Sequence, residues 1–267
     1  LLKTINSVVS QSFTGIEYIV IDGGSTDCSR KYLEDYSSRI SYWISEPDKG
    51  IYHAMNKGIL ASHGEYILFL NSGDILYNAN VIDSVIAHLN NVDFVIGKLM
   101  FDNTRTVSVL PCDLTLLRFI EHSIPHPSTF VKRDVMIKYM YDENLKIVAD
   151  WKFFMEALIF GNASYKYIDN IIVLFDTSGI SSINKVATES EREKVLCEML
   201  PDRVRIDYMR FIKGGFYSGD NYDIFYSKIK KSKIGHISYF MSVMLVKLLS
   251  LFKRNLRFVK DFPLLLR

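Results

Sequence analysis

Two acidic residues stand at the ends of short apolar runs, where a sheet would present them to a ligand. Asp22 directly follows the run 18–21. Asp74 ends the turn-like segment 71–74, which comes after the run 66–70. Such runs fit buried parallel strands, and ligands of an open parallel sheet bind beyond the carboxyl ends of its strands. One carboxylate at this edge can hold Mg²⁺ or Mn²⁺ together with nucleotide phosphates. A second carboxylate at the same edge can accept hydrogen bonds from a base or a ribose. We therefore predict Asp74 as a metal ligand and Asp22 as a nucleoside contact; the alternative is that both are ordinary turn acids.

The residues near these acids add further candidates for contacts with such a ligand. Gly23 would let a ligand approach the backbone closely, because it has no side chain. Asp48 and Lys49 precede Gly50, where we expect a helix to begin, and Asn56 lies further along that helix. A helix N-terminus favours anions, so Asp48, Lys49 and Asn56 are predicted donor contacts. Solvated loop charges are the alternative interpretation.

The elements that must position these residues alternate in the first half of the chain. Hydrophobic patterning predicts strands at 17–22, 40–45, 65–70 and 93–97, and helices at 25–36, 50–62 and 81–89. This alternation is typical of a mainly parallel sheet with helices on its faces. The second half is less regular, with strands expected at 129–131, 165–169 and 171–175 and helices at 151–160 and 189–199.

Length, charge and cysteine usage limit the class of protein. The 267 residues suffice for one large α/β domain with appendages or for two small domains. The formal net charge of +2 is too small to indicate a nucleic-acid partner, and no nucleic-acid-binding motif stands out. Cys28, Cys112 and Cys197 are far apart, which favours a reducing, cytoplasmic setting. A dinucleotide oxidoreductase is disfavoured because no Gly-x-Gly-x-x-Gly turn follows an expected strand.

Five motifs occur together in one order and spacing. They are IDGGSTD at 21–27, SEPDKGIY at 45–52, AMNKGI at 54–59, GEYI at 64–67 and LNSGD at 70–74. Together they resemble bacterial family 2 glycosyltransferases of the GT-A fold, strongly over residues 1 to about 110 and more weakly to about 185. The resemblance implies an α/β, Rossmann-like mixed sheet, mainly parallel and flanked by helices, with a C-terminal helical tail. It also implies that the first strand of the fold is missing, since the chain begins at Leu1.

The same resemblance divides the chain into regions. Residues 1–185 are expected to form the GT-A domain, with a nucleotide-sugar half at 1–110 and an acceptor half at 111–185. Residues 186–267 form a helical C-terminal extension. Between Lys228 and Lys260 of this extension, basic residues surround an apolar stretch. That pattern suits a helix lying on an anionic membrane surface, here the inner face of the cell membrane, or an amphipathic helix packed on the domain or on a homodimer partner.

The acidic turn departs from the common family pattern. Asp74 resembles the last acid of the Asp-x-Asp-type metal motif, but Asn71 and Gly73 stand where aspartates often stand. One carboxylate then remains in the turn, so donor phosphates must complete the shell of Mg²⁺ or Mn²⁺. Asn71 is either a helper that offers its amide oxygen or a plain turn residue. Asp22 resembles the acid that contacts the nucleoside.

Two residues of the second half resemble residues that lie at the acceptor side in these enzymes. An inverting transfer needs a carboxylate that takes the proton of the acceptor hydroxyl, and Asp150 in the segment 147–151 is the candidate base. Its alternative is an N-cap of the helix expected at 151–160. His126, between Pro125 and Pro127, is predicted as an acceptor-side residue, with a packed structural histidine as the alternative.

The leading hypothesis is therefore an inverting glycosyltransferase. It would move a sugar from a nucleoside diphosphate sugar, UDP-linked, to a saccharide or lipid-linked saccharide acceptor in surface polysaccharide synthesis. The competing hypothesis is a catalytically inactive, nucleotide-binding GT-A module that acts as a scaffold. The reduced acidic turn is the feature that keeps this second hypothesis open.

Overall fold

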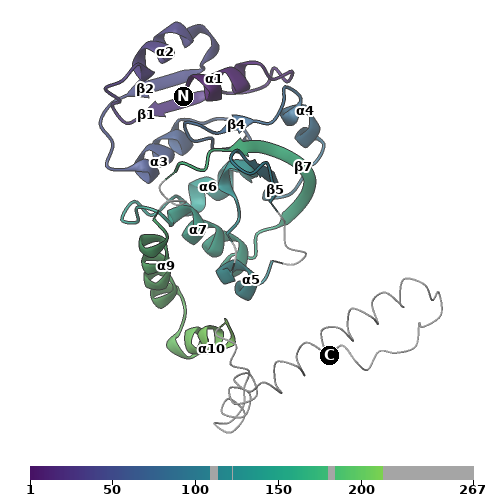
Figure 1. Cartoon of the computed structure of the whole chain (residues 1–267). Coiled ribbons are helices and arrows are strands. Elements are labelled where there is room, and N and C mark those ends of the chain that lie inside the picture. Colours follow the sequence, from purple (N-terminus) through teal and green to yellow (C-terminus); the bar gives the residue numbers. More distant parts are fainter. Residues whose placement is uncertain (109–113, 122, 180–183, 213–267) are drawn as a thin grey trace, which may run out of the picture. The chain divides into compact units, whose positions relative to one another are not determined.

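A computed structural model of the chain describes residues 1–108, 114–121, 123–179 and 184–212 (Figure 1). The chain divides into two compact units, Leu1–Arg205 and Ile206–Arg267. The Lys228–Lys260 stretch, on which the membrane and dimer interpretations depend, lies outside the described residues, as does Cys112. The first unit holds every predicted site residue.

Within the described residues, seven strands form two sheets. They are β1 (Ile19–Asp22), β2 (Tyr42–Ser45), β3 (Tyr66–Ile67), β4 (Ile75–Leu76), β5 (Phe94–Phe101), β6 (Thr129–Lys132) and β7 (Tyr165–Phe175). The small sheet pairs β1 with β2 in parallel, so that Asp22 lies opposite Ser45. The larger sheet has the order β3-β6-β5-β7-β4.

The expected mixed sheet flanked by helices is confirmed, but less of it is parallel than predicted. In the five-stranded sheet only β5 and β7 are parallel, and the other three pairings are antiparallel. Hydrophobic patterning locates strands but does not report their direction, which depends on how the connections run. The strands β3 and β4 on either side of the 71–74 turn are both antiparallel to their neighbours.

Helices cover the sheets and connect the strands. They are α1 (Leu2–Val9), α2 (Ser29–Asp35), α3 (Ile51–Ala61), α4 (Val81–Ile86), α5 (Leu116–Glu121), α6 (Arg133–Tyr139), α7 (Ala149–Phe154), α9 (Lys185–Met199) and α10 (Asp202–Ile212), with short 3-10 turns at Ser37–Arg39 and His126–Ser128 and a π-helical turn at Met155–Phe160. Of the helices that the structure describes, none has the length and apolar character needed to span a membrane.

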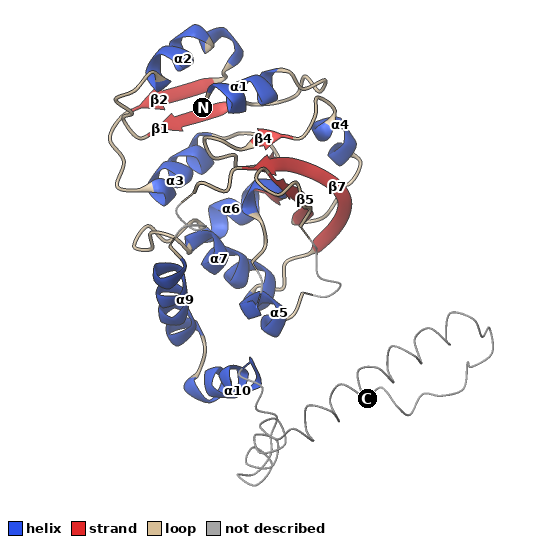
Figure 2. Cartoon of the chain, viewed as in Figure 1, coloured by secondary structure: helices blue, strands red, loops and turns tan. Residues whose placement is uncertain are grey.

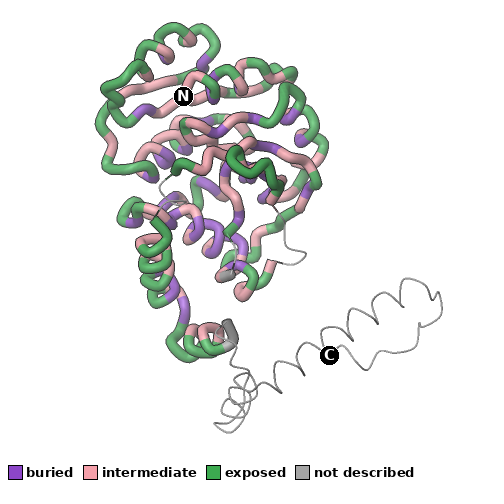
Figure 3. Tube along the Cα trace, viewed as in Figure 1, coloured by how far each residue is buried: buried purple, intermediate pink, exposed green. Residues whose placement is uncertain are grey.

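The five-stranded sheet buries side chains on both faces, because successive residues of a strand point to opposite sides. Phe94 and Ile96 of β5 join one hydrophobic cluster, and Val95 between them joins another. Helices α3, α5, α6 and α7 contribute to the first cluster, and α1 and α4 to the second. Figure 2 shows the helices and strands, and Figure 3 shows which stretches of the chain are buried. A third cluster joins α1 and α2 to the two-stranded sheet.

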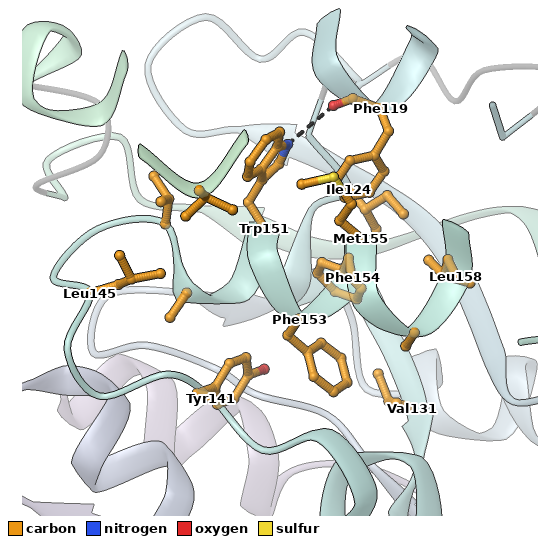
Figure 4. Close-up of a cluster of buried hydrophobic side chains, with 14 of the residues drawn as sticks. Phe119, Ile124, Val131, Tyr141, Leu145, Trp151, Phe153, Phe154, Met155 and Leu158 are labelled. Atoms are coloured by element: carbon orange, nitrogen blue, oxygen red, sulfur yellow. Dashed lines mark hydrogen bonds between the residues drawn. The ribbon is translucent and has the colours of Figure 1, made fainter. Parts of the chain in front are cut away.

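Buried aromatic side chains fix α7 within the first cluster (Figure 4). Trp151 is 2% exposed, and its indole N–H donates to the carbonyl of Phe119 over 3.1 Å. Phe153 and Phe154, each 1% exposed, pack on Phe94. Truncating a core aromatic residue to alanine costs about 3–5 kcal/mol, so the position of α7 is strongly determined.

The start of α7 decides between the two interpretations of Asp150. Val148 occupies the N-cap position and the helix begins at Ala149, so Asp150 is already helical. The interpretation of Asp150 as the N-cap of a helix starting at Trp151 is therefore wrong. The carboxylate instead accepts a hydrogen bond from the N–H of Trp151 over 2.8 Å, within the first turn.

Candidate active site

Asp22 lies where the two parallel strands β1 and β2 end side by side. Its carboxylate accepts hydrogen bonds from the N–H and hydroxyl of Ser25, over 3.0 and 2.5 Å, and from the Ser45 hydroxyl over 2.6 Å. Burial raises the pKa of Asp22, but these hydrogen bonds outweigh it and hold the pKa below its usual value. Asp22 is therefore ionised at neutral pH. Because Ser25 is engaged here, α2 begins only at Ser29, later than the pattern predicted.

Gly23 and Asp48 meet beside this carboxylate. A Cβ on Gly23 would lie 3.3 Å from Asp48 Oδ2. The other oxygen of Asp48 contacts Lys57 Nζ over 2.5 Å and His53 Nδ1 over 3.0 Å, both from α3. Oδ2 is buried and has no hydrogen-bond partner among the described residues. The loop therefore presents one unpartnered acceptor next to Gly23, and Lys49 is exposed beside it.

Asn56 has a different set of neighbours from the other predicted donor contacts. Its side-chain amide is buried and donates to the carbonyl of Tyr141 and to Glu143 Oε1, each over 2.9 Å. Its Oδ1 accepts from the N–H of Tyr141 over 2.9 Å. Since both ends of the amide are used, the geometry assigns Asn56 to holding the 141–143 segment on α3. We leave it out of the donor contacts proposed below.

Asp74 closes the 71–74 turn from the inside. It is 1% exposed, and its carboxylate accepts from the backbone N–H groups of Asn71 and Asp176 over 3.2 and 3.0 Å. Burial raises the pKa of Asp74, and the two backbone hydrogen bonds offset this only in part. The residue thus anchors the turn to the end of β7. Ile21 and Phe69 both lie beside Gly58 of α3, so this helix supports the strands that lead to both acids.

Asp176 is a residue that the sequence interpretation missed. It directly follows β7, and its Oδ2 lies where a Cβ on Gly73 would be. The N–H of Gly73 donates to Thr4 Oγ1 of α1 over 3.1 Å, which fixes the turn from the other side. An acid directly after an apolar strand was the signal that identified Asp22, and the same signal could have found Asp176.

The structure brings Asn71, His126 and Asp150 into one hydrogen-bonded row. Asn71 Nδ2 lies 3.2 Å from His126 Nε2, and His126 Nδ1 lies 2.9 Å from Asp150 Oδ2. With the Asn71 amide donating, Nε2 carries a lone pair, so Nδ1 carries the hydrogen and donates to the carboxylate. The row connects the acidic turn to the predicted base, although these residues are far apart in the sequence.

Asp150 is held as an ionised carboxylate. Burial raises its pKa, but the hydrogen bond from His126, with smaller contributions from Trp151 and Tyr52, lowers it below the usual value. The hydroxyl of Tyr52 lies 3.2 Å from Asp150 Oδ1 and 2.6 Å from the carbonyl of Ile147. Burial raises the pKa of Tyr52, so its phenol stays neutral. About a fifth of the Asp150 side chain, 21%, is exposed and can meet a substrate.

The oxygens around the turn fit a hard divalent cation that is completed by its ligand. Carboxylate and amide oxygens are what Mg²⁺ and Mn²⁺ prefer, and such ions are usually held by one or two carboxylates together with substrate phosphates. Among the described residues, no three His, Cys, Asp or Glu side chains converge as a complete metal site. A cation here would therefore depend on the phosphates of a bound nucleotide.

Comparison with known proteins decides the family. The model of Glycosyl transferase family 2 matches residues 1–140, more than half of the chain. The chain belongs to this family. An uncharacterized glycosyltransferase of Mycobacterium tuberculosis (strain CDC 1551 / Oshkosh) is 33% identical over 190 residues, which cover 68% of this chain and 72% of that protein. The resemblance carried by the motifs is confirmed, and the protein is a glycosyltransferase.

A second relative and two solved structures extend this comparison. A PGL/p-HBAD biosynthesis glycosyltransferase of Mycobacterium bovis (strain BCG / Pasteur 1173P2) is 28% identical over 156 residues, 56% of this chain and 60% of that protein. An S. aureus TarS fragment in complex with UDP has a TM-score of 0.55 at 22% identity, covering 65% of this chain and 55% of that chain. Glucosyl-3-phosphoglycerate synthase of Mycobacterium tuberculosis, with Mn²⁺, UDP and glucosyl-3-phosphoglycerate, has a TM-score of 0.52 at 14% identity, covering 73% and 74%. At these identities the two structures establish the GT-A fold.

Proposed function

We propose that this family 2 glycosyltransferase moves a sugar, with inversion at the anomeric carbon, from a nucleoside diphosphate sugar to a saccharide or lipid-linked saccharide. The row Asn71–His126–Asp150 is the observation that carries the proposal. It joins the turn that would hold the donor cation to an ionised carboxylate. An inverting transfer needs these two features close together, one for the leaving diphosphate and one for the acceptor hydroxyl.

The nucleoside of the donor is assigned to Asp22 and the loop beside it. An ionised Asp22 accepts hydrogen bonds, so it suits an N–H group of a base or a ribose hydroxyl. Gly23 allows the close approach, and the unpartnered Oδ2 of Asp48 is a second acceptor there. Lys49 is the exposed cation of the same loop. UDP is the proposed nucleotide because the S. aureus TarS fragment and glucosyl-3-phosphoglycerate synthase, which share the fold, hold UDP.

Mg²⁺ or Mn²⁺ is the proposed cofactor, held at the 71–74 turn. Asp74 would supply the fixed negative charge of this site and Asn71 its amide oxygen. When bound, the cation neutralises charge on the diphosphate that leaves the sugar. Support comes from the oxygen-rich turn and from the synthase of the same fold, which holds Mn²⁺ with UDP.

Asp150 is the proposed base on the acceptor side. It takes the proton of the acceptor hydroxyl as that oxygen forms its bond to the anomeric carbon and the bond to the diphosphate breaks. His126 donates to Asp150 Oδ2, and the N–H of Trp151 donates to Oδ1, which also lies 3.2 Å from the Tyr52 hydroxyl. These contacts orient the carboxylate, and the second lone pair of Oδ2 would take the proton of the acceptor. Because Asp150 is ionised at neutral pH, no preceding deprotonation is required.

A cell-surface glycan is the proposed destination of the sugar. The Mycobacterium bovis relative is named for PGL/p-HBAD biosynthesis, which supports a lipid-linked or glycan acceptor. A cytoplasmic location at the inner face of the membrane, and a homodimer, remain part of the proposal. Both depend on the Lys228–Lys260 stretch, which lies outside the described residues.

A sugar-transfer assay on the full chain tests the function. UDP-, GDP- and dTDP-sugars would be supplied with Mn²⁺ and a panel of saccharide and lipid-linked acceptors, and product would be followed by mass spectrometry. We expect Asp150→Asn to lower turnover by about 10²–10⁴-fold, the usual contribution of a general base. UDP affinity measured by calorimetry should stay unchanged in this variant.

The exposed acid Asp134 of α6 offers a matched control, since Asp134→Asn removes the same charge from the same half of the chain. This variant should transfer sugar normally. If Asp150→Asn turned over like Asp134→Asn, the base assignment would be wrong. If the unaltered chain bound UDP and transferred no sugar in any combination, the inactive scaffold hypothesis would replace the proposal.

A further inference from the structure

We infer that Asp176, at the carboxyl end of β7, supplies the carboxylate that the acidic turn lacks at Gly73 and so completes the cation site of the sugar donor. The inference rests on the proposed function, because it concerns the cation that would bind the donor diphosphate. Asn71 and Gly73 stand where family members often carry acids, which leaves Asp74 as the turn's own carboxylate. A second carboxylate has to come from another segment.

Strand register brings Asp176 to this place. β4 and β7 are antiparallel, with Ile75 opposite Leu174 and Leu76 opposite Val173. Continuing the register outward by two residues places Gly73 opposite Asp176. The Cβ atoms of directly opposed residues on antiparallel strands lie about 4.5–5.5 Å apart, so a side chain from one position can reach over the other.

The backbone at Gly73 leaves this space to Asp176. Its φ of +112° is a conformation that residues with a side chain rarely adopt. A Cβ built on Gly73 would overlap Asp176 Oδ2 and would lie 3.0 Å from the Cβ and Cγ of Asp176. The carboxylate of Asp176 therefore fills the volume that an acid at position 73 would need. The fold has room for one of these two acids, and this chain carries it on β7.

Hydrogen bonds position Asp176 and leave one of its oxygens available. Its N–H donates to Asp74 Oδ1 over 3.0 Å, and its Oδ1 accepts from the N–H of Ser178 over 2.9 Å. The next residue, Thr177, is tied to Asp102 Oδ1 through its N–H and its hydroxyl, over 3.2 and 2.8 Å. Neither set of bonds engages Oδ2, the oxygen that lies over Gly73.

The two acids are suited to different tasks in one site. Asp74 is 1% exposed and is held from behind by backbone N–H groups, whereas Asp176 is partly exposed at the surface of the turn. A hard divalent cation that arrives with a diphosphate needs ligands it can reach without unfolding the turn, together with a fixed negative charge behind them. Asp176 provides the first and Asp74 the second.

Manganese binding to the full chain tests the inference by a readout that needs no turnover. Mn²⁺ would be titrated into the chain saturated with UDP, and free Mn²⁺ would be followed by electron paramagnetic resonance. Asp176→Asn keeps the size of the side chain and removes its charge. We expect Mn²⁺ affinity to fall at least about tenfold, since even residues that only support metal ligands typically contribute 10–100-fold. UDP affinity without metal should not change.

Asp169 lies on the same strand and provides the control. Its carboxylate is 92% exposed and pairs with Lys98, so Asp169→Asn removes an acid from β7 away from the turn. This variant should bind Mn²⁺ as the unaltered chain does. The inference is overturned if Asp176→Asn also binds Mn²⁺ with unchanged affinity.

Exchanging the two residues makes the test sharper. Asp176→Gly combined with Gly73→Asp returns the acid to the turn and removes the overlap, so Mn²⁺ affinity should recover relative to Asp176→Asn. Gly73→Asp alone should destabilise the fold, because its side chain meets Asp176 and its backbone is strained. A doubly substituted chain that keeps its melting temperature and binds no better than Asp176→Asn would contradict a shared site.

The outcomes separate this inference from the proposed function. A chain that transfers sugar equally well with all divalent cations chelated would overturn the inference and leave the function standing. If the Mn²⁺ affinity of the chain depends on Asp176 but the chain transfers no sugar, the inference stands and the proposed function is wrong.

Discussion

Asp22 and Asp74 share one sequence signal, an acid at the end of an apolar strand, but the fold gives them opposite environments. The carboxylate of Asp22 receives two serine hydroxyls and a backbone N–H. Burial raises the pKa of Asp22, yet these donors hold it below the usual value. The carboxylate of Asp74 receives two backbone N–H groups, and there burial prevails and raises the pKa. Asp22, 9% exposed, is kept ionised by its donors, whereas Asp74, 1% exposed, serves as an internal anchor.

The direction of the neighbouring strand explains the difference. β1 and its parallel neighbour β2 end together, so that Asp22 lies opposite Ser45, whose hydroxyl donates to the Asp22 carboxylate. Asp74 precedes β4, and Asp176, the first residue after the antiparallel neighbour β7, lies over the turn. At the parallel pair, side-chain donors therefore surround the acid, whereas at the antiparallel pair the neighbouring segment covers the acid and adds one of its own.

Removing the Asp74 carboxylate should have the largest effect on stability. Asp74→Ala leaves the partly buried N–H groups of Asn71 and Asp176 without their acceptor, and each such loss costs about 1–3 kcal/mol. We expect a total destabilisation of about 2–6 kcal/mol, measured by urea unfolding. Asp22→Ala should cost less, because two of its three donors are serine hydroxyls, which can rotate to other acceptors. If Asp22→Ala and Asp74→Ala lowered the free energy of unfolding equally, Asp74 could not be distinguished from Asp22 as a structural anchor.

Some features of the strands and acids could be predicted from the sequence alone, and others could not. The approximate positions of most strands and of the helices between them were predictable, because hydrophobic runs and turn residues are local signals. Strand ends were less predictable, since β3 ends at Ile67 and not at Leu70, and β5 continues to Phe101. Strand direction was not predictable, since it depends on connections. The proximity of Gly73 and Asp176 could not be predicted either, because the two residues lie opposite each other only through the antiparallel register of β4 and β7.

The interpretations of Asn56 and Asp150 were limited for a related reason. A polar residue near a helix start is a reasonable ligand contact, but Asn56 faces the 141–143 segment, a partner that local sequence does not reveal. The helix carrying Asp150 starts earlier than expected, at Ala149. Its base role gained support from His126, a contact between residues 24 positions apart. Long-range partners, rather than local propensity, decide such roles.

Donor affinity should respond next to the charge of Asp22. Asp22→Asn keeps one acceptor oxygen but turns a second acceptor into a donor that faces the hydroxyls of Ser25 and Ser45. We expect UDP affinity without metal to fall about tenfold, equivalent to about 1.4 kcal/mol, by calorimetry. Asp74→Asn should leave this metal-free affinity nearly unchanged. If Asp74→Asn lowered the metal-free UDP affinity more than Asp22→Asn did, the assignment of the nucleoside to Asp22 would be wrong.

A pH series should separate the two carboxylates by the sign of their effect. The folded pKa of Asp22 lies below the unfolded value of about 3.9, so its stabilisation is complete above that value and is lost as the pH falls through the folded pKa. The folded pKa of Asp74 lies above the unfolded value, so ionisation costs stability as the pH rises, and acid removes that cost. Between about pH 6 and about pH 3, the destabilisation by Asp22→Asn should shrink and that by Asp74→Asn should grow. The melting temperature of each variant would be measured across this pH range. If the loss of melting temperature changed with pH in the same direction for both variants, the assignment would be contradicted.

The smallest effect is expected from a single donor to Asp22. Ser45→Ala removes one hydroxyl, but the N–H of Ser25 still donates to the same oxygen, so the carboxylate keeps its orientation. The loss should be about 0.5–1.5 kcal/mol in urea unfolding, and the pKa of Asp22 should rise toward its usual value. The exposed Ser38→Ala serves as the control and should change neither. Asp74 allows no equivalent substitution, because its donors belong to the backbone. If Ser45→Ala destabilised the chain as strongly as Asp74→Ala, Asp22 would be an anchor of the same kind.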